Sequence, residues 1–102
     1  MKTTETKFSD AFATFYAGCI EIYTANCDRQ GFSHRDTFSF TDGNRYVRVL
    51  RGGSAHAFVD KQNGDVLKPA NWKAPAKHAR GNIYDNTNGL GLMNEYGPAY
   101  LR

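Results

Sequence analysis

Three glycine-containing dipeptides follow one another in the middle of the chain, and they constrain its fold more than any other feature. They are Asp42-Gly43, Gly52-Gly53 and Asn63-Gly64. Dipeptides of this kind supply the positive φ angles that tight turns between antiparallel strands require. They predict a meander of short antiparallel strands near residues 37–41, 45–51, 55–60 and 65–68.

A long amphipathic helix is predicted before this meander, over residues 8–28. Mostly apolar residues recur there at spacings of three and four, namely Phe8, Phe12, Phe15, Cys19, Ile22, Tyr23 and Asn26. Gly31 suits the left-handed conformation that commonly ends a helix. Gly18 lies in the middle of the helix, where glycine is unfavourable relative to alanine, and the close approach of a strand would explain it.

A chain of 102 residues is long enough for one domain. In the second predicted strand, Val47 and Val49 share one face, while Tyr46, Arg48 and Leu50 share the other. Such a sheet must cover its apolar face, and the predicted helix is the element available to do so. We therefore expect a single α+β domain over residues 1–102, with the N-terminal helix packed on an antiparallel meander of three to five strands.

The stretch after the meander changes character. Pro69 and Pro75 interrupt any long element. Pro75 is suited to open a helical turn over residues 76–80, which Gly81 would close. We expect a last short strand at Ile83 and Tyr84. The tail contains three residues that we expect to pack back onto the domain, namely Met93, Tyr96 and Tyr100.

Cysteine usage and hydropathy indicate the cellular setting. Cys19 and Cys27 lie eight residues apart on the predicted helix, which places them roughly 12 Å apart, too far for a disulfide. We expect two reduced, buried thiols. No apolar run reaches the roughly 18 residues that a membrane span needs, and residues 1–10 lack the apolar stretch of a signal peptide. We expect a cytoplasmic protein that does not enter a membrane.

Positive charge is concentrated in one part of the chain. Residues 43–84 contain eight basic and two acidic residues, a net charge of +6, while the remainder carries −3. From Val66 to Tyr84 there is no acidic residue at all. This asymmetry favours an anionic partner, although a solvated basic face that keeps the protein soluble is the alternative.

Part of this basic region resembles a known family. The segment begins with Gly64-Asp65-Val66, continues through Trp72-Lys73-Ala74-Pro75-Ala76-Lys77 and ends with Arg80-Gly81-Asn82. It is similar to a segment of small uncharacterised tailed-phage proteins, and so is the preceding strand, Ala55–Asp60, except that the family pattern has valine at Ala55. The resemblance covers about a third of the chain. It implies a phage setting, inside an infected host cell, and no particular activity.

The residues of this segment predict an anion-binding surface. The candidate ligand-binding residues are Lys68, Trp72, Lys73, Lys77, His78, Arg80 and Asn82. Lysine and arginine attract phosphate, and arginine binds it in a bidentate manner. Trp72 would either stack on a base or anchor the core. The expected ligand is therefore a phosphodiester, either a nucleotide signal or a nucleic acid, used in host takeover or counter-defence.

Two other functions remain open at this stage. In the first, the protein is an interaction module that binds an acidic surface of a host enzyme or polymerase and inhibits it. Alternatively, His34, His56 and His78 would support a small ribonuclease. We expect no enzymatic activity, because no glutamate lies in the meander to act as a base, and no cofactor. We expect no metal, because neither the histidine nor the cysteine spacing matches a ligand motif. A homo-oligomer with a ligand pocket between its subunits is one arrangement that the binding function allows.

Overall fold

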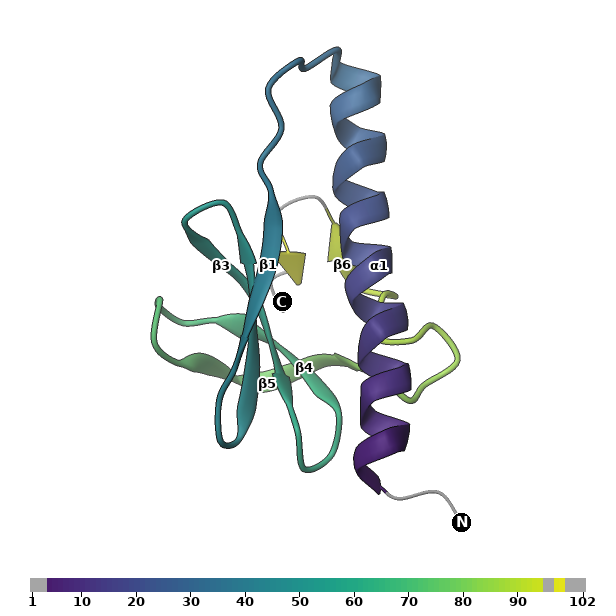
Figure 1. The fold of residues 1–102 in the computed structure, drawn as a ribbon, viewed down its shortest axis with the longest axis vertical. Coiled ribbons are helices and arrows are strands. Elements are labelled where there is room, and N and C mark those ends of the chain that lie inside the picture. The colour runs from purple at the N-terminus through teal and green to yellow at the C-terminus, as the bar shows by residue number, and fades with distance from the viewer. Residues whose placement is uncertain (1–3, 95–96, 99–102) are drawn as a thin grey trace.

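The structure is a computed structural model that describes residues 4–94 and 97–98, with side chains from Phe8 onward. It confirms the predicted α+β fold: one N-terminal helix packs on a five-stranded antiparallel sheet of order β1-β2-β3-β4-β5 (Figure 1). The elements are α1 (Thr4–Gln30), β1 (Phe38–Asp42), β2 (Tyr46–Arg51), β3 (Ser54–Asp60), β4 (Asp65–Pro69), β5 (Pro75–Asn82), β6 (Met93–Asn94) and β7 (Gly97–Pro98). The last two strands pair with each other.

The apolar stripe of α1 forms one side of the core. Phe15 and Cys19 are almost completely buried, and they pack against the strands through Val49, Val59 and Val66. The helix ends where the sequence predicts. Gly31 has a φ of 74°, its N–H donates to the Asp28 carbonyl, and the N–H of Phe32 donates to the Cys27 carbonyl at 3.0 Å. These two bonds form the Schellman motif that satisfies the last carbonyls of a helix.

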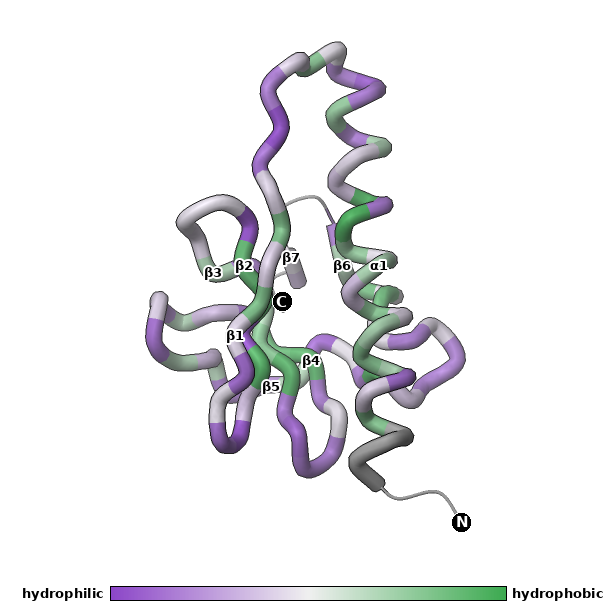
Figure 2. The backbone as a smooth tube through the Cα atoms, in the orientation of Figure 1, coloured by the Kyte–Doolittle hydropathy of each residue, from purple (hydrophilic) through white to green (hydrophobic). Residues whose placement is uncertain are grey.

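The sheet is buried on both of its faces at its centre. Val47 is opposite Val59 and Val49 is opposite Ala57, and these residues face α1. On the face turned away from α1, Phe58 is opposite Leu67, and both are buried. Figure 2 shows the resulting apolar centre of the sheet, with hydrophilic segments at the turns.

Two predictions for the region after β4 are wrong. Residues 76–80 form no helical turn, because they belong to the eight-residue strand β5, in which Ala79 pairs with Leu67 and Pro75 pairs with Pro69. A single helical turn gains too few hydrogen bonds to be stable alone, whereas β4 offers backbone partners along β5, although two irregularities interrupt the pairing. Ile83 and Tyr84 lie in a turn after β5 rather than in a strand.

The loop after this turn explains the glycine in the middle of α1. A Cβ atom on Gly18 would lie 2.3 Å from Leu90 Cδ1. The partner of Gly18 is therefore the side chain of a loop residue, not the strand that the sequence suggested. Met93 packs against the core as expected, while Tyr96 and Tyr100 lie outside the described residues. Cys19 and Cys27 are both free and buried, as predicted.

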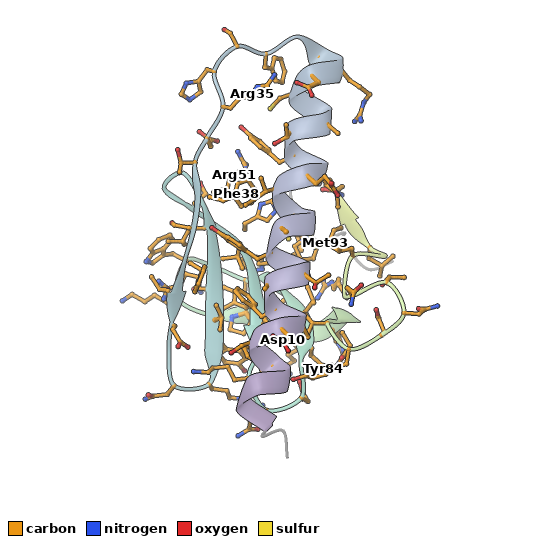
Figure 3. All side chains as sticks on the ribbon, turned by 45° about the vertical axis from the view of Figure 1, so that its right-hand side comes forward. Asp10, Arg35, Phe38, Arg51, Tyr84 and Met93 are labelled. Carbon is orange, nitrogen blue, oxygen red and sulfur yellow. The ribbon has the colours of Figure 1, made fainter. Side chains whose placement is uncertain are left out.

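The C-terminal part of α1 and the segment 31–37 run side by side beyond the sheet (Figure 1). The Asp36 N–H donates to the Tyr23 hydroxyl at 3.0 Å, and Arg51 forms an ion pair with Asp36 at 2.7 Å. Figure 3 shows Arg51 and Phe38 close together in the space between this part of α1 and β1. A further ion pair of 2.6 Å joins Arg35 to Asp28, so the segment is held to the helix along its length.

Candidate anion-binding site

The hairpin of β4 and β5 carries all seven candidate residues, but two of them serve the fold. The Lys68 ammonium donates a hydrogen bond of 3.1 Å to the Pro98 carbonyl, which ties β4 to β7. The Asn82 side-chain amide donates to the Asn63 carbonyl at 2.8 Å and to Asp65 Oδ1 at 3.0 Å. Its oxygen accepts the N–H of Tyr84 at 2.9 Å. These bonds hold the turn after β5 against the turn before β4.

The other basic side chains of the hairpin are at the surface. Lys73 is exposed at the tip, in the connection between the strands, and Lys77 and His78 are exposed on β5. Arg80 is half-buried and donates a hydrogen bond to the His78 carbonyl. Two irregularities interrupt the pairing of β5 with β4, so the side chains of β5 do not alternate regularly between the faces of the sheet. The basic patch expected from the sequence is thus reduced to the exposed side chains of Lys73, Lys77 and His78.

Trp72 neither anchors the core nor lies free in solvent. It is 46% exposed, and the guanidinium carbon of Arg48 lies 4.8 Å from the centroid of its ring. The same carbon lies 5.9 Å from the Phe58 ring. Arg48 therefore belongs to the site, although the candidate residues predicted from the sequence did not include it. Its position between Tyr46 and Leu50 on one strand face was the available signal.

Arg48 differs from the other arginines of the meander in lacking a carboxylate partner among the described residues. Arg45 pairs with Asp60 at 3.0 Å, and this hydrogen bond, together with the charge of Asp60, raises the pKa of the Arg45 guanidinium. Arg51 pairs with Asp36. The Nε atoms of Arg48 and Arg51 are both buried without a hydrogen-bond partner, but only Arg48 also lacks a carboxylate at its terminal nitrogens among the described residues. Burial of an unsatisfied cationic donor is costly, and this cost makes Arg48 a candidate for an external acceptor.

A cleft lies on the same face of the sheet. Its volume is about 520 Å³, which is within the range of small-molecule sites. Tyr46 from β2, Leu67 from β4 and Lys77 from β5 line it, and Arg45 and Asp60 also contribute to its lining. The full set of lining residues is Arg45, Tyr46, Asp60, Asn63, Asp65, Leu67, Ala74, Pro75, Ala76 and Lys77.

The acids of the cleft are already bound by the protein. Asp60 is buried, and besides its pair with Arg45 it accepts the N–H of Gln62 at 2.8 Å. Asp65 accepts a hydrogen bond from Asn82. Among the described residues, Lys77 has no such carboxylate partner. The face therefore combines one acid paired with an arginine, Asp60, and one acid that is hydrogen-bonded by an amide, Asp65, with two cations that have no carboxylate partner among the described residues, Arg48 and Lys77.

The three histidines lie in three different environments. His34 is on the segment 31–37, with its side chain 89% exposed. His56 is buried on β3, and His78 is exposed on β5. General acid–base cleavage of RNA needs two such groups around one phosphate, and this arrangement does not favour it. The described part of the chain contains no cluster of His, Cys, Asp and Glu able to hold a metal.

Comparison with known proteins adds a family but no activity. Residues 4–99 match a family of unknown function, DUF7717. Neither the curated proteins nor the solved structures include a significant match. Within the described residues, no helix is both long enough and apolar enough to cross a membrane.

Proposed function

The chain belongs to DUF7717, a family of unknown function, and we propose that it is a non-enzymatic module that binds a phosphodiester ligand on the sheet face turned away from α1. The observation that carries the proposal is the environment of the Arg48 side chain. Its guanidinium contacts two aromatic rings, its Nε is buried without a partner, and no carboxylate among the described residues pairs with it. A phosphate would bind the terminal nitrogens of this guanidinium, because guanidinium groups bind phosphate through parallel hydrogen bonds.

The surroundings of Arg48 suit a ligand that combines a phosphate with a flat ring. Trp72 keeps nearly half of its surface exposed while Arg48 covers part of its ring, and Tyr46 lines the adjoining cleft. Stacking of one base on an aromatic side chain contributes about 1–3 kcal/mol. Lys77 from β5 and Lys73 at the hairpin tip add positive charge, and neither has an acidic partner among the described residues. A nucleotide or a single-stranded nucleic acid fits this set better than inorganic phosphate does.

The setting of the function is proposed from the sequence resemblance. The similarity of residues 64–82 to small tailed-phage proteins supports a role in the cytoplasm of an infected host, in host takeover or counter-defence. Two nucleotide-containing ligands follow from this setting, a signalling nucleotide of a host defence system and a nucleic acid. Both place a phosphodiester against Arg48.

The experiment that tests this function uses the only tryptophan of the chain as its reporter. Trp72 emission is followed at low salt during titration with mononucleotides, cyclic dinucleotides, a single-stranded oligothymidylate, inorganic phosphate and a polyglutamate peptide. We expect a change in emission with at least one nucleotide-containing ligand, with dissociation in the micromolar range. The affinity should fall as salt rises, because phosphate contacts release counterions.

Charge-removing variants locate the bound ligand. Lys73→Ala and Lys77→Ala should each weaken binding by about 1–3 kcal/mol, the range for hydrogen bonds to charged groups, and leave stability nearly unchanged because both side chains are exposed. Arg29→Ala is the matched control, since it removes one positive charge from the end of α1. If Arg29→Ala weakens binding as much as Lys77→Ala, the ligand responds only to net charge and the proposed site is wrong.

The same titration tests the competing function, an interaction module that docks on an acidic host protein. Binding of polyglutamate, with no nucleotide ligand tighter than millimolar, would replace the phosphodiester proposal with that function. Binding of inorganic phosphate as tightly as of any nucleotide would show that the aromatic residues play no part.

A further inference from the structure

A shallow apolar groove lies on the other side of the molecule, between α1 and the first strand of the sheet. Its volume is about 360 Å³. Four aromatic residues line it, three from the first turns of α1 and one from β1: Phe8, Phe12, Tyr16 and Phe40. Phe40 is 47% exposed, although its ring centroid lies 5.1 Å from those of both Phe12 and Tyr16. One side of the Phe40 ring is thus covered by α1, and much of the remainder is open.

The strand that carries Phe40 is an edge strand. Among the described strands, β1 is hydrogen-bonded to β2 alone, so every second residue directs its backbone N–H and C=O groups away from the sheet. The pattern of bonds identifies these residues. The Gly52 N–H donates to Thr37, and the Gly43 N–H donates to the Tyr46 carbonyl. Residues 37 and 43 therefore bond toward β2, and the alternation assigns the outward backbone groups to Phe38, Phe40 and Asp42.

The two edges of the sheet differ in how they are protected against further pairing. β5, the opposite edge, contains Pro75, Lys77 and Arg80, and its pairing with β4 is interrupted by two irregularities. Proline, cationic side chains and bulges are the usual means of blocking an edge strand. β1 has the sequence Phe-Ser-Phe-Thr-Asp and pairs with β2 in one continuous register. It contains no proline, no cationic side chain and no irregularity, and its one charged residue, Asp42, is its last.

We infer that β1 pairs with β1 of a second copy of this chain, in an antiparallel dimer whose twofold axis passes beside Phe40. This arrangement places Phe40 opposite Phe40 of the second copy, so that the two residues exchange both of their backbone hydrogen bonds. Phe38 of each copy then lies opposite Asp42 of the other. The pairing is self-complementary, as a twofold interface requires, and it joins the two sheets into one.

The charges around the groove favour a second copy over a charged partner. The two charged side chains that line the groove, Asp42 and Lys61, form an ion pair with each other at 2.6 Å. The groove is therefore neutral in a chain of net charge +3, and two copies meet there without repulsion. The Phe40 rings of the two copies lie on the same face of the joined sheet, where each covers the exposed side of the other. The partner is thus this chain itself, and the inference does not depend on the proposed ligand site, which is on the other face of the sheet.

Sedimentation equilibrium over a wide range of protein concentration tests the dimer. We expect reversible association of the wild-type chain into dimers in the micromolar range. Phe40→Pro removes both the ring and the outward N–H of Phe40 while leaving the bonds from β1 to β2 in place, and it should be monomeric. Phe40→Ala keeps the N–H and should raise the dissociation constant at least tenfold. Phe32→Ala, at another exposed phenylalanine, is the matched control and should dimerise as the wild type does.

Amide hydrogen exchange provides a second measurement that needs no variant. The Phe40 N–H should exchange more slowly as protein concentration rises, whereas the Ser39 and Thr41 N–H groups, which bond to β2, should exchange at a rate independent of concentration. A wild-type chain that remains monomeric at several hundred micromolar would overturn the inference. Dimers that persist in Phe40→Pro, with unchanged Phe40 exchange in the wild type, would also overturn it, because they would show association through another surface.

Discussion

The guanidinium carbon of Arg48 lies 4.8 Å from the centre of the Trp72 ring, although 23 residues separate the two along the chain. This contact holds the connection between β4 and β5 over the face of the sheet that is turned away from α1. It joins the only tryptophan of the chain to the cation on which the proposed function depends. A substitution at either residue should therefore change the stabilising contribution of the other.

A double-mutant cycle measures this coupling. Trp72→Ala and Arg48→Met should each lower the free energy of unfolding, and the double variant should lose less than the sum of the two. We expect a coupling of about 0.5–1 kcal/mol, the range for cation–π contacts near a surface. Urea denaturation followed by circular dichroism provides the measurement. Strictly additive losses would show that the two side chains do not interact in solution.

Two glycines with similar backbone angles should respond differently to alanine. Gly89 has a φ of 78°, and a Cβ atom there would lie 2.8 Å from Val66 Cγ2 and 3.2 Å from Phe15 Cδ1. Gly31 has a φ of 74° with nothing within 4 Å. Gly31→Ala should cost about 1–2 kcal/mol for the left-handed conformation alone. Gly89→Ala adds overpacking of the core, typically about 1–3 kcal/mol. Equal losses in urea denaturation would contradict the close packing around Gly89.

The sequence predicted the parts of the fold whose conformation is determined by residues that are close together in the chain. The spacing of Phe12, Phe15 and Cys19 is enough to identify a helix face, and the glycine turns are enough to divide the meander. The segment of β5 was predicted as a helical turn because proline and glycine, here Pro75 and Gly81, commonly open and close a helix. Its strand conformation depends instead on its pairing with β4. The neighbour of Gly18 was predicted to be a strand. The actual neighbour, Leu90, is far from Gly18 in the chain, so no local pattern identifies it.

The sequence predicted which segment of the chain contains the candidate binding residues. It did not predict which of their side chains lie together on one surface. Composition identified the stretch as rich in cations, and Lys73 and Lys77 are exposed, but it did not predict the hairpin of β4 and β5 that carries them. It did not show that Lys68 bonds to Pro98 or that Asn82 bonds to Asp65, because these are tertiary hydrogen bonds. Arg48 was omitted because its role follows from Trp72 folding back over β2. No local pattern encodes that path.

The two cysteines should be unreactive in the native protein. Burial raises the pKa of the Cys19 thiol to about 12, and the thiolate is the reactive form. A bulky aromatic disulfide reagent at mildly alkaline pH should label neither Cys19 nor Cys27 quickly, and should label both in urea. Ser33→Cys, at an exposed position, is the control that must react at once in the native state. Rapid modification of Cys19 in the native protein would show that α1 separates readily from the sheet.

The last prediction concerns His56, whose ring packs edge-on against Phe38 with 5.1 Å between their centroids. Burial, together with the positive charges of Arg51 and Lys68, lowers the pKa of His56 from 6.5 to about 4. The folded state therefore keeps His56 neutral, while the unfolded chain takes up a proton as pH falls below about 6.5. Since the unfolded state then binds more protons, the protein loses stability as pH decreases toward about 4, and below that value the loss from His56 stops.

The expected size follows from the shift. A difference of roughly 2.5 pH units at 1.36 kcal/mol each amounts to about 3 kcal/mol. Urea denaturation between pH 7.5 and pH 4.5 should show most of this loss, about 2.5 kcal/mol, in the wild type and in His34→Gln, whose imidazole is exposed and serves as the matched control. His56→Phe keeps a ring against Phe38 but cannot be protonated, so its stability should fall far less over the same range. An NMR titration that finds His56 protonating near pH 6.5 in the folded protein would contradict its burial among Phe38, Arg51 and Lys68.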